Sequence, residues 1–86
     1  MSEQLEQTTI EQRIIDMAAE QTAVARENIT RADSFVGDLG YDSLDVAEFV
    51  MNLEEAFDLS VSDEEVADLP TVGQVIDYVS ARVSAR

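Results

Sequence analysis

The stretch from Ser43 to Phe57 constrains the fold more than any other, because as a helix it is apolar on two opposite sides. At about 100° per residue, one side has the spacing of a buried stripe, formed by Val46, Phe49, Val50, Leu53 and Phe57. The opposite side mixes apolar and acidic residues, namely Leu44, Ala47, Glu48, Met51 and Glu55. A helix needs only one face to join a core, so the second face is available to a partner.

A first helix is predicted from a capping box near Thr8 to an end near residue 22 or 23. Thr8 with Glu11, or Thr9 with Gln12, has the spacing with which two side chains satisfy each other's backbone amides. The apolar side of this helix is formed by Ile10, Ile14, Met17 and Ala18. Residues 1–7 are polar and lack a helical period, so we expect a flexible N-terminal tail and a folded domain over residues 8–86.

The connection from Val24 to Asp38 is long for a small domain, so some of its residues must be anchored in the core. The expected anchors are its apolar residues and the leucine that follows it: Val24, Ile29, Phe35, Val36 and Leu39. Gly40 comes next. We expect it to allow a tight approach to Ser43, since glycine accepts backbone angles that other residues resist.

Two more helices are predicted after Phe57. Ser62 and Glu65 form a capping box that opens a short helix near residues 63–68, and Pro70 ends it. Thr71 and Gln74 then cap a final helix. The apolar face of that helix is formed by Val72, Val75, Ile76, Val79 and Val83.

No stretch has a convincing strand pattern, so the chain is predicted to be all-α, a small bundle of three main helices and one short helix. The predicted core is drawn from the central helix and the segments after it: Val46, Phe49, Val50, Leu53, Phe57, Leu59, Val61, Val66, Leu69 and Ile76.

Charge narrows the partners that such a bundle can bind. The chain has 19 acidic residues, 5 arginines and no histidine, with a net charge of −14. Nucleic acid and anionic membranes are excluded as ordinary partners, because binding to them depends on Lys and Arg. No basic residue lies between Ala32 and Ala81, and we expect this region to bind basic protein surfaces.

The chain has no cysteine, which excludes a disulfide, a thiolate nucleophile and a sulfur metal site. No stretch approaches the roughly 20 apolar residues of a membrane span, and the N-terminus lacks the features of a signal peptide. We therefore expect a cytoplasmic protein, and we expect it to be a monomer.

Enzymatic functions lack the residues that they need. Ser43 has no histidine or lysine in the chain to act as its base, so a hydrolase-type nucleophile is implausible. The spacing of Asp38, Gly40 and Asp42 is similar to that of a calcium loop, but the twelfth position is Phe49 instead of glutamate, so an EF-hand is rejected. We expect no catalytic residues and no dedicated metal site.

Ser43 has two interpretations. A serine just before a helical run is usually an N-cap. However, the motif LGYDSLD, from Leu39 to Asp45, resembles the attachment loop of the acyl carrier protein family, in which the serine carries 4′-phosphopantetheine. The likeness to bacterial carrier proteins runs from Asp33 to Val79 without a gap and extends to the first helix. Thr22 departs from it, because the family tends to have an aliphatic residue there.

The resemblance implies the acyl carrier protein fold and a non-catalytic carrier of the dissociated bacterial fatty-acid-synthase type. Ser43, beside Asp42 and Leu44, would receive the arm from coenzyme A through a phosphopantetheinyl transferase. The arm's thiol would hold acyl intermediates as thioesters for fatty acid synthesis enzymes, and part of the core would open for the acyl chain. Basic surfaces of those enzymes would dock on a face formed by Asp42, Leu44, Asp45, Ala47, Glu48, Met51 and Glu55.

Two alternatives stay open. The chain could carry a specialised polyketide or aminoacyl cargo, since its negative charge favours fatty acyl groups only by family analogy. It could also be an acidic helical interaction module without a prosthetic group, in which Ser43 is only a cap.

Overall fold

The computed structural model describes residues 2–84, with the side chains of residues 9–62, 64–66 and 68–84. Its helices are α1 (Ser2–Ala19), α2 (Ser43–Phe57), α3 (Asp63–Ala67) and α4 (Val72–Ser84), with a 3-10 turn, η1 (Arg26–Asn28). No strand occurs within residues 2–84, where Ser34 and Thr71 form an isolated β-bridge. The predicted fold class, three main helices and one short helix, is confirmed.

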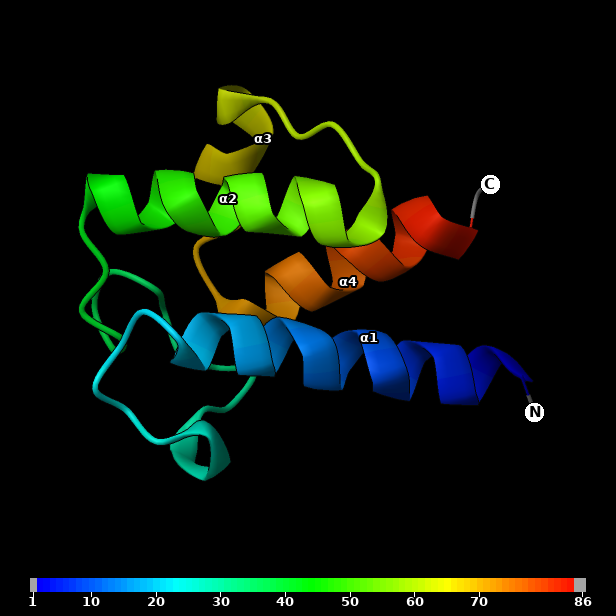
Figure 1. The fold of residues 1–86 in the computed structure, drawn as a ribbon, viewed down its shortest axis with the longest axis horizontal. Helices are drawn as coiled ribbons and strands as arrows, with labels where there is room; N and C mark the ends of the chain where they lie inside the picture. The colour runs from blue at the N-terminus through cyan, green and yellow to red at the C-terminus, as the bar shows by residue number, and fades with distance from the viewer. Residues whose placement is uncertain (1, 85–86) are drawn as a thin grey trace.

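The helices form a small bundle in which the most extensive helix–helix contact is between α1 and α4. Helices α1 and α2 run in opposite directions, α4 crosses between them, and α3 lies on the side of α2 away from α1 (Figure 1). Helix α1 packs against both α2 and α4. The long connection between α1 and α2 lies at the end of the bundle opposite the two termini (Figure 1). It therefore leads directly to the first residue of α2.

The core forms where the apolar faces of α1, α2 and α4 meet. Its buried residues are Ile10, Ile14, Ala18, Ile29, Phe35, Leu39, Tyr41, Phe49, Leu53, Phe57, Val72, Val75, Ile76 and Val79. Of the predicted core, Phe49, Leu53, Phe57 and Ile76 are buried. The remaining predicted core residues are only partly buried: Val46, Val50, Leu59, Val61, Val66 and Leu69. Helix α3 has five residues, and so short a helix covers the apolar stripe of α2 incompletely.

Helix α1 differs from its predicted bounds at both ends. It begins at Ser2, so Thr8 and Thr9 lie inside the helix and do not cap it. No glycine or proline precedes Thr8, and glutamate, glutamine and leucine are good helix formers, so nothing stops the helix there. The helix ends at Ala19, three or four residues before its predicted end. Residues 1, 85 and 86 lie outside the described residues, and the division into a flexible tail and a carrier domain stays a prediction.

The connection between α1 and α2 is anchored by four of the five expected residues, of which Val24 packs partly buried against the core. Ile29, Phe35 and Leu39 are buried, whereas Val36, which we expected to point inward, is 68% exposed. The backbone pairs with the start of α4, because Phe35 N–H donates to the carbonyl of Pro70 at 3.1 Å. Pairing holds the segment in place, and Val36 lies in the turn beside it.

Arginine side chains link elements that lie far apart in the sequence. Arg31 pairs with Glu11 of α1 at 2.7 Å and with Asp77 of α4 at 2.6 Å. Arg13 of α1 lies over the Phe57 ring, with 4.7 Å between the guanidinium carbon and the ring centroid. Arg31 thus joins α1 to α4, and Arg13 joins α1 to the last residues of α2.

Candidate functional site

Ser43 is the first residue of α2, and Asp42 is its N-cap. The Asp45 N–H donates to Asp42 Oδ1 at 2.9 Å, and the Asp42 N–H donates to Asp45 Oδ2 at 3.2 Å. This reciprocal pair satisfies amides that helix geometry leaves without partners. The interpretation of Ser43 as the cap is therefore wrong. Its side chain is exposed, and the helix does not need its hydroxyl.

The segment before Ser43 turns at Gly40 and then fixes Tyr41 in the core. Gly40 has φ +74°, a left-handed conformation that favours glycine. The Tyr41 N–H donates to the carbonyl of Phe35 at 2.8 Å, and the Tyr41 side chain is 2% exposed. Tyr41 was not predicted to be a core or site residue. The available signal was an aromatic residue placed between the turn glycine Gly40 and the cap residue Asp42.

The face that was predicted to dock is on the surface. Leu44 is 67% exposed and Met51 is 63% exposed, although both are large and apolar. Asp42, Ala47, Glu48 and Glu55 are exposed as well, and Asp45, which completes the cap, is half-buried. Six of the seven predicted residues are thus exposed around the start and along the outer face of α2, and the seventh, Asp45, is partly exposed. Val36 is a third exposed large apolar residue, which the sequence analysis placed in the core.

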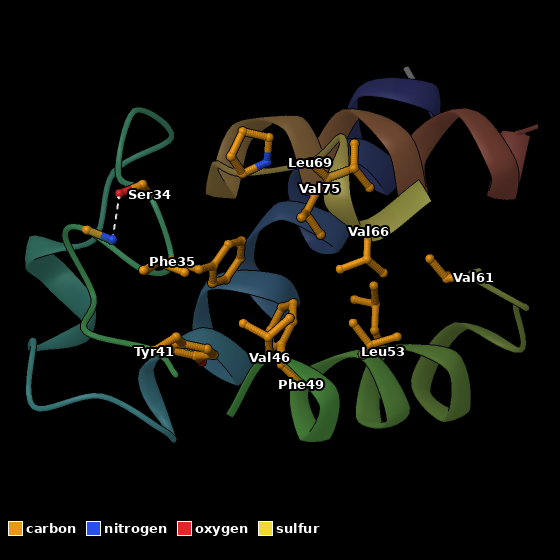
Figure 2. Close-up of a pocket in the computed structure, with 14 residues that line it drawn as sticks. Ser34, Phe35, Tyr41, Val46, Phe49, Leu53, Val61, Val66, Leu69 and Val75 are labelled. Atoms are coloured by element: carbon orange, nitrogen blue, oxygen red, sulfur yellow. Dashed lines mark hydrogen bonds between the residues drawn. The ribbon is translucent and has the colours of Figure 1, made fainter. Parts of the chain in front are cut away.

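An apolar cavity of about 320 Å³ lies between α2 and the segment that holds α3 and the start of α4 (Figure 2). Side chains of Val46, Phe49 and Leu53 point into it from α2, toward Val66 and Val75 on the other side (Figure 2). Most of the predicted core residues that are only partly buried line this cavity: Val46, Val50, Val61, Val66 and Leu69. They were expected to contribute to a core that opens for an acyl chain.

One end of the cavity is aromatic. The rings of Phe35, Tyr41 and Phe49 pack with centroids 5.0–6.1 Å apart, and two of the three pairs meet edge to face. The hydroxyls near this end already have partners. Tyr41 donates to the carbonyl of Ala18 at 2.7 Å, and Ser34 Oγ accepts from the Gly37 N–H at 3.0 Å (Figure 2). The lining therefore offers little to a polar ligand.

The phenol of Tyr41 is not a candidate base for Ser43. Burial raises the pKa of the Tyr41 phenol to about 12, and the carboxylates of Asp45 and Glu20 add to the rise. The phenol is therefore neutral at physiological pH and cannot take a proton from Ser43. Among the described residues, no group of three or more histidine, cysteine or acidic side chains is arranged to hold a metal ion. Within the same part of the chain, no helix has the length and apolarity to cross a membrane.

Comparisons with known proteins agree with this geometry. The model of the family described as "Phosphopantetheine attachment site" matches residues 12–79, a stretch that includes Ser43. Among solved structures, the chain is similar to the acyl carrier protein from Enterococcus faecalis, studied for its high thermal stability. The two superpose with a TM-score of 0.77 and 28% identity, over 87% of this chain and 95% of that one. The chain thus belongs to the acyl carrier protein family, and its expected covalent cofactor is 4′-phosphopantetheine.

Proposed function

We propose that this protein carries acyl groups on a 4′-phosphopantetheine arm attached to Ser43 and delivers them to enzymes of fatty acid synthesis. The observation that carries the proposal is an exposed serine hydroxyl, free of any capping role, at the start of α2 and three residues before Val46, which lines an apolar cavity. In this proposal the chain is a non-catalytic, cytoplasmic, monomeric carrier.

The start of α2 suits the arm on two counts. A phosphate joined to Ser43 lies at the positive end of the helix, where the first amides point outward. The exposed Leu44 offers an apolar contact next to the attachment point. Once attached, the arm supplies the thiol on which acyl groups are held as thioesters.

Attachment needs an enzyme. Asp42 and Asp45 flank Ser43 and repel a free phosphate, and within the described residues Ser43 has no basic partner to activate it. A phosphopantetheinyl transferase with a basic surface meets both needs, because it binds the acids and brings its own base and metal.

The cavity supports a hydrocarbon cargo. Each methylene group that enters it gains about 0.8 kcal/mol. A keto or amino group that is buried there without a partner costs about 1–3 kcal/mol. The hydroxyls of Ser34 and Tyr41 have partners within the protein, so the lining favours a fatty acyl chain over a polyketide or aminoacyl group.

The acidic face supports docking to basic enzymes. Leu44 and Met51 provide apolar contact area between the carboxylates of Asp45, Glu48 and Glu55. The negative charge of this face speeds the encounter with a positively charged partner, and contacts of the apolar side chains then stabilise the complex.

Intact mass spectrometry after co-expression with a phosphopantetheinyl transferase tests the attachment. We expect wild type and Ser60→Ala, a control at another exposed serine, to gain the mass of one arm, and Ser43→Ala to gain none. Because Asp42 caps the helix, Ser43→Ala should change the free energy of unfolding by less than about 0.5 kcal/mol. An arm that persists in Ser43→Ala would refute the residue. A wild type that never gains mass would favour the interaction module.

A further inference from the structure

The hydroxyl of Thr22, the residue that departs from the family pattern, takes part in two hydrogen bonds. Thr22 lies beyond the end of α1, and its Oγ1 donates to the carbonyl of Leu39 at 2.6 Å. The same oxygen accepts the Val24 N–H at 3.3 Å, which orients the hydroxyl. An aliphatic residue could fill this half-buried space but could not make either bond. The threonine therefore connects the chain after α1 to the segment that leads to Ser43.

Tyr41 makes a second connection to the same end of α1. Its hydroxyl donates to the carbonyl of Ala18 at 2.7 Å, in the last turn of the helix. The ring is held between Phe35 and Phe49, so the hydroxyl has little freedom to leave this partner. Phenylalanine would fill the same space without this bond.

The two bonds lie on either side of the turn at Gly40. Thr22 holds the residue before Gly40, and Tyr41 is the residue after it. Asp42 follows directly and caps α2, so its position is set by the residues that precede it. A continuous path of contacts thus runs from the end of α1 to the cap and to Ser43.

We propose that Thr22 and Tyr41 are positioning residues for the attachment of the arm to Ser43, a role that rests on the proposed function of that serine. Their hydroxyls hold residues 39–41 against the end of α1, so the cap is formed and Ser43 is presented before the transferase arrives. Neither side chain belongs to the docking face. Their loss should therefore slow the chemical step and leave the binding of the carrier largely unchanged.

The test compares transferase kinetics on Thr22→Val and Tyr41→Phe with those on wild type, at a temperature at which circular dichroism shows every variant folded. We expect kcat to fall about three- to tenfold for each variant, while KM for the carrier changes less than about twofold. Thr22→Ser keeps the hydroxyl and should restore kcat. Amide exchange in the unmodified variants should be faster at Asp45 and Val46, whose N–H groups donate to Asp42.

Tyr78→Phe is the matched control. It also removes a tyrosine hydroxyl that makes a hydrogen bond, 2.5 Å from Glu65 Oε2, but this bond joins α4 to α3. Its kcat should equal that of wild type. Wild-type kcat in Thr22→Val and Tyr41→Phe, or an equal fall in Tyr78→Phe, would overturn the positioning role. Failure of the proposed function is distinguishable, because wild type would then take no arm at Ser43 at all.

Discussion

At the scale of single residues, the site depends on which of two neighbouring side chains caps α2. Both aspartate and serine are good N-caps. Asp42 takes the position because Asp45, three residues later, returns the bond to the Asp42 backbone. Ser43 is consequently displaced into the first turn, where its hydroxyl projects into solvent. Had α2 begun one residue later, Ser43 would be the N-cap. In its observed position the hydroxyl is exposed and an enzyme could reach it.

Tyr41 makes a prediction about alkaline stability. Its pKa is raised from 10.0 to about 12 in the folded state, so its proton is held more tightly there than in the unfolded chain. The resulting stabilisation is fully present below pH 10 and is lost as the pH rises toward 12, with a total of about 2–3 kcal/mol. Urea unfolding across this range should show the loss in wild type and a much smaller one in Tyr41→Phe.

The smaller loss of stability at high pH that remains in Tyr41→Phe is attributed to Tyr78. Burial and the bond to Glu65 also raise the pKa of Tyr78, so this residue contributes a further alkaline decrease in stability. The double variant with Tyr78→Phe should remove it. Equal pH dependence in wild type and Tyr41→Phe would show that the phenol of Tyr41 is not buried as the structure has it.

At the scale of elements, α2 packs into the core with one face and is proposed to dock with the other, and a pair of substitutions tests this proposal. Leu53 is 2% exposed, and Leu53→Ala should cost about 2–5 kcal/mol because it enlarges the void beside the existing cavity. Met51 is 63% exposed, and Met51→Ala should change the free energy of unfolding by less than about 0.5 kcal/mol.

The same pair should behave in the opposite way toward partners. Met51→Ala should weaken transfer to or from at least one partner enzyme, since the flexible thioether adapts to differently shaped grooves. Chemical unfolding and acyl transfer assays measure the two effects. If Met51→Ala destabilised the fold as much as Leu53→Ala does, the second face would be part of the core and the docking proposal would be wrong.

The helical periods were sufficient to predict the fold, but they were not sufficient to predict the cavity or the helix ends. The spacing of Phe49, Leu53 and Phe57 identified the buried side of α2, because the helical period determines which side chains share one face of a helix. Period does not say whether a facing element is long enough to cover that side. Because α3 is too short to cover this side of α2, Val46 and Val66 line a cavity. Tyr41 was missed because its burial depends on residues that lie far from it in the sequence.

The ends of helices were predicted correctly only in part. A capping pair marks the start of a helix only where the residues before the pair are not themselves helical. The pairs at Ser62 and Thr71 do cap helices or their first turns, since Pro70 and the segment after Phe57 interrupt the pattern. The pair at Thr8 has no such interruption before it, so α1 continues back to Ser2.

At the scale of the whole molecule, some acidic residues pair with arginines within the fold, and others, on α2, are proposed to bind partners. Arg31 and Arg82 are engaged with acids of α1, α3 and α4, where they join neighbouring elements. These pairs are exposed, and such pairs contribute little each. The acids at the start and on the outer face of α2 contribute to the net charge of −14 and cost stability through repulsion. In the proposed docking, a basic partner removes that cost.

Salt should therefore act on the two processes with opposite signs. Raising sodium chloride from about 0.05 M to about 0.5 M shortens the Debye length, so the melting temperature should rise while association with a basic partner enzyme slows by roughly tenfold or more. Calorimetry and stopped-flow binding measure these effects.

Glu48→Lys should slow association at low salt, mainly through the on-rate. Glu27→Lys makes the same change of charge on η1, away from α2, and should slow it far less. Equal slowing by both variants would mean that net charge alone attracts the partner and that α2 has no special docking face.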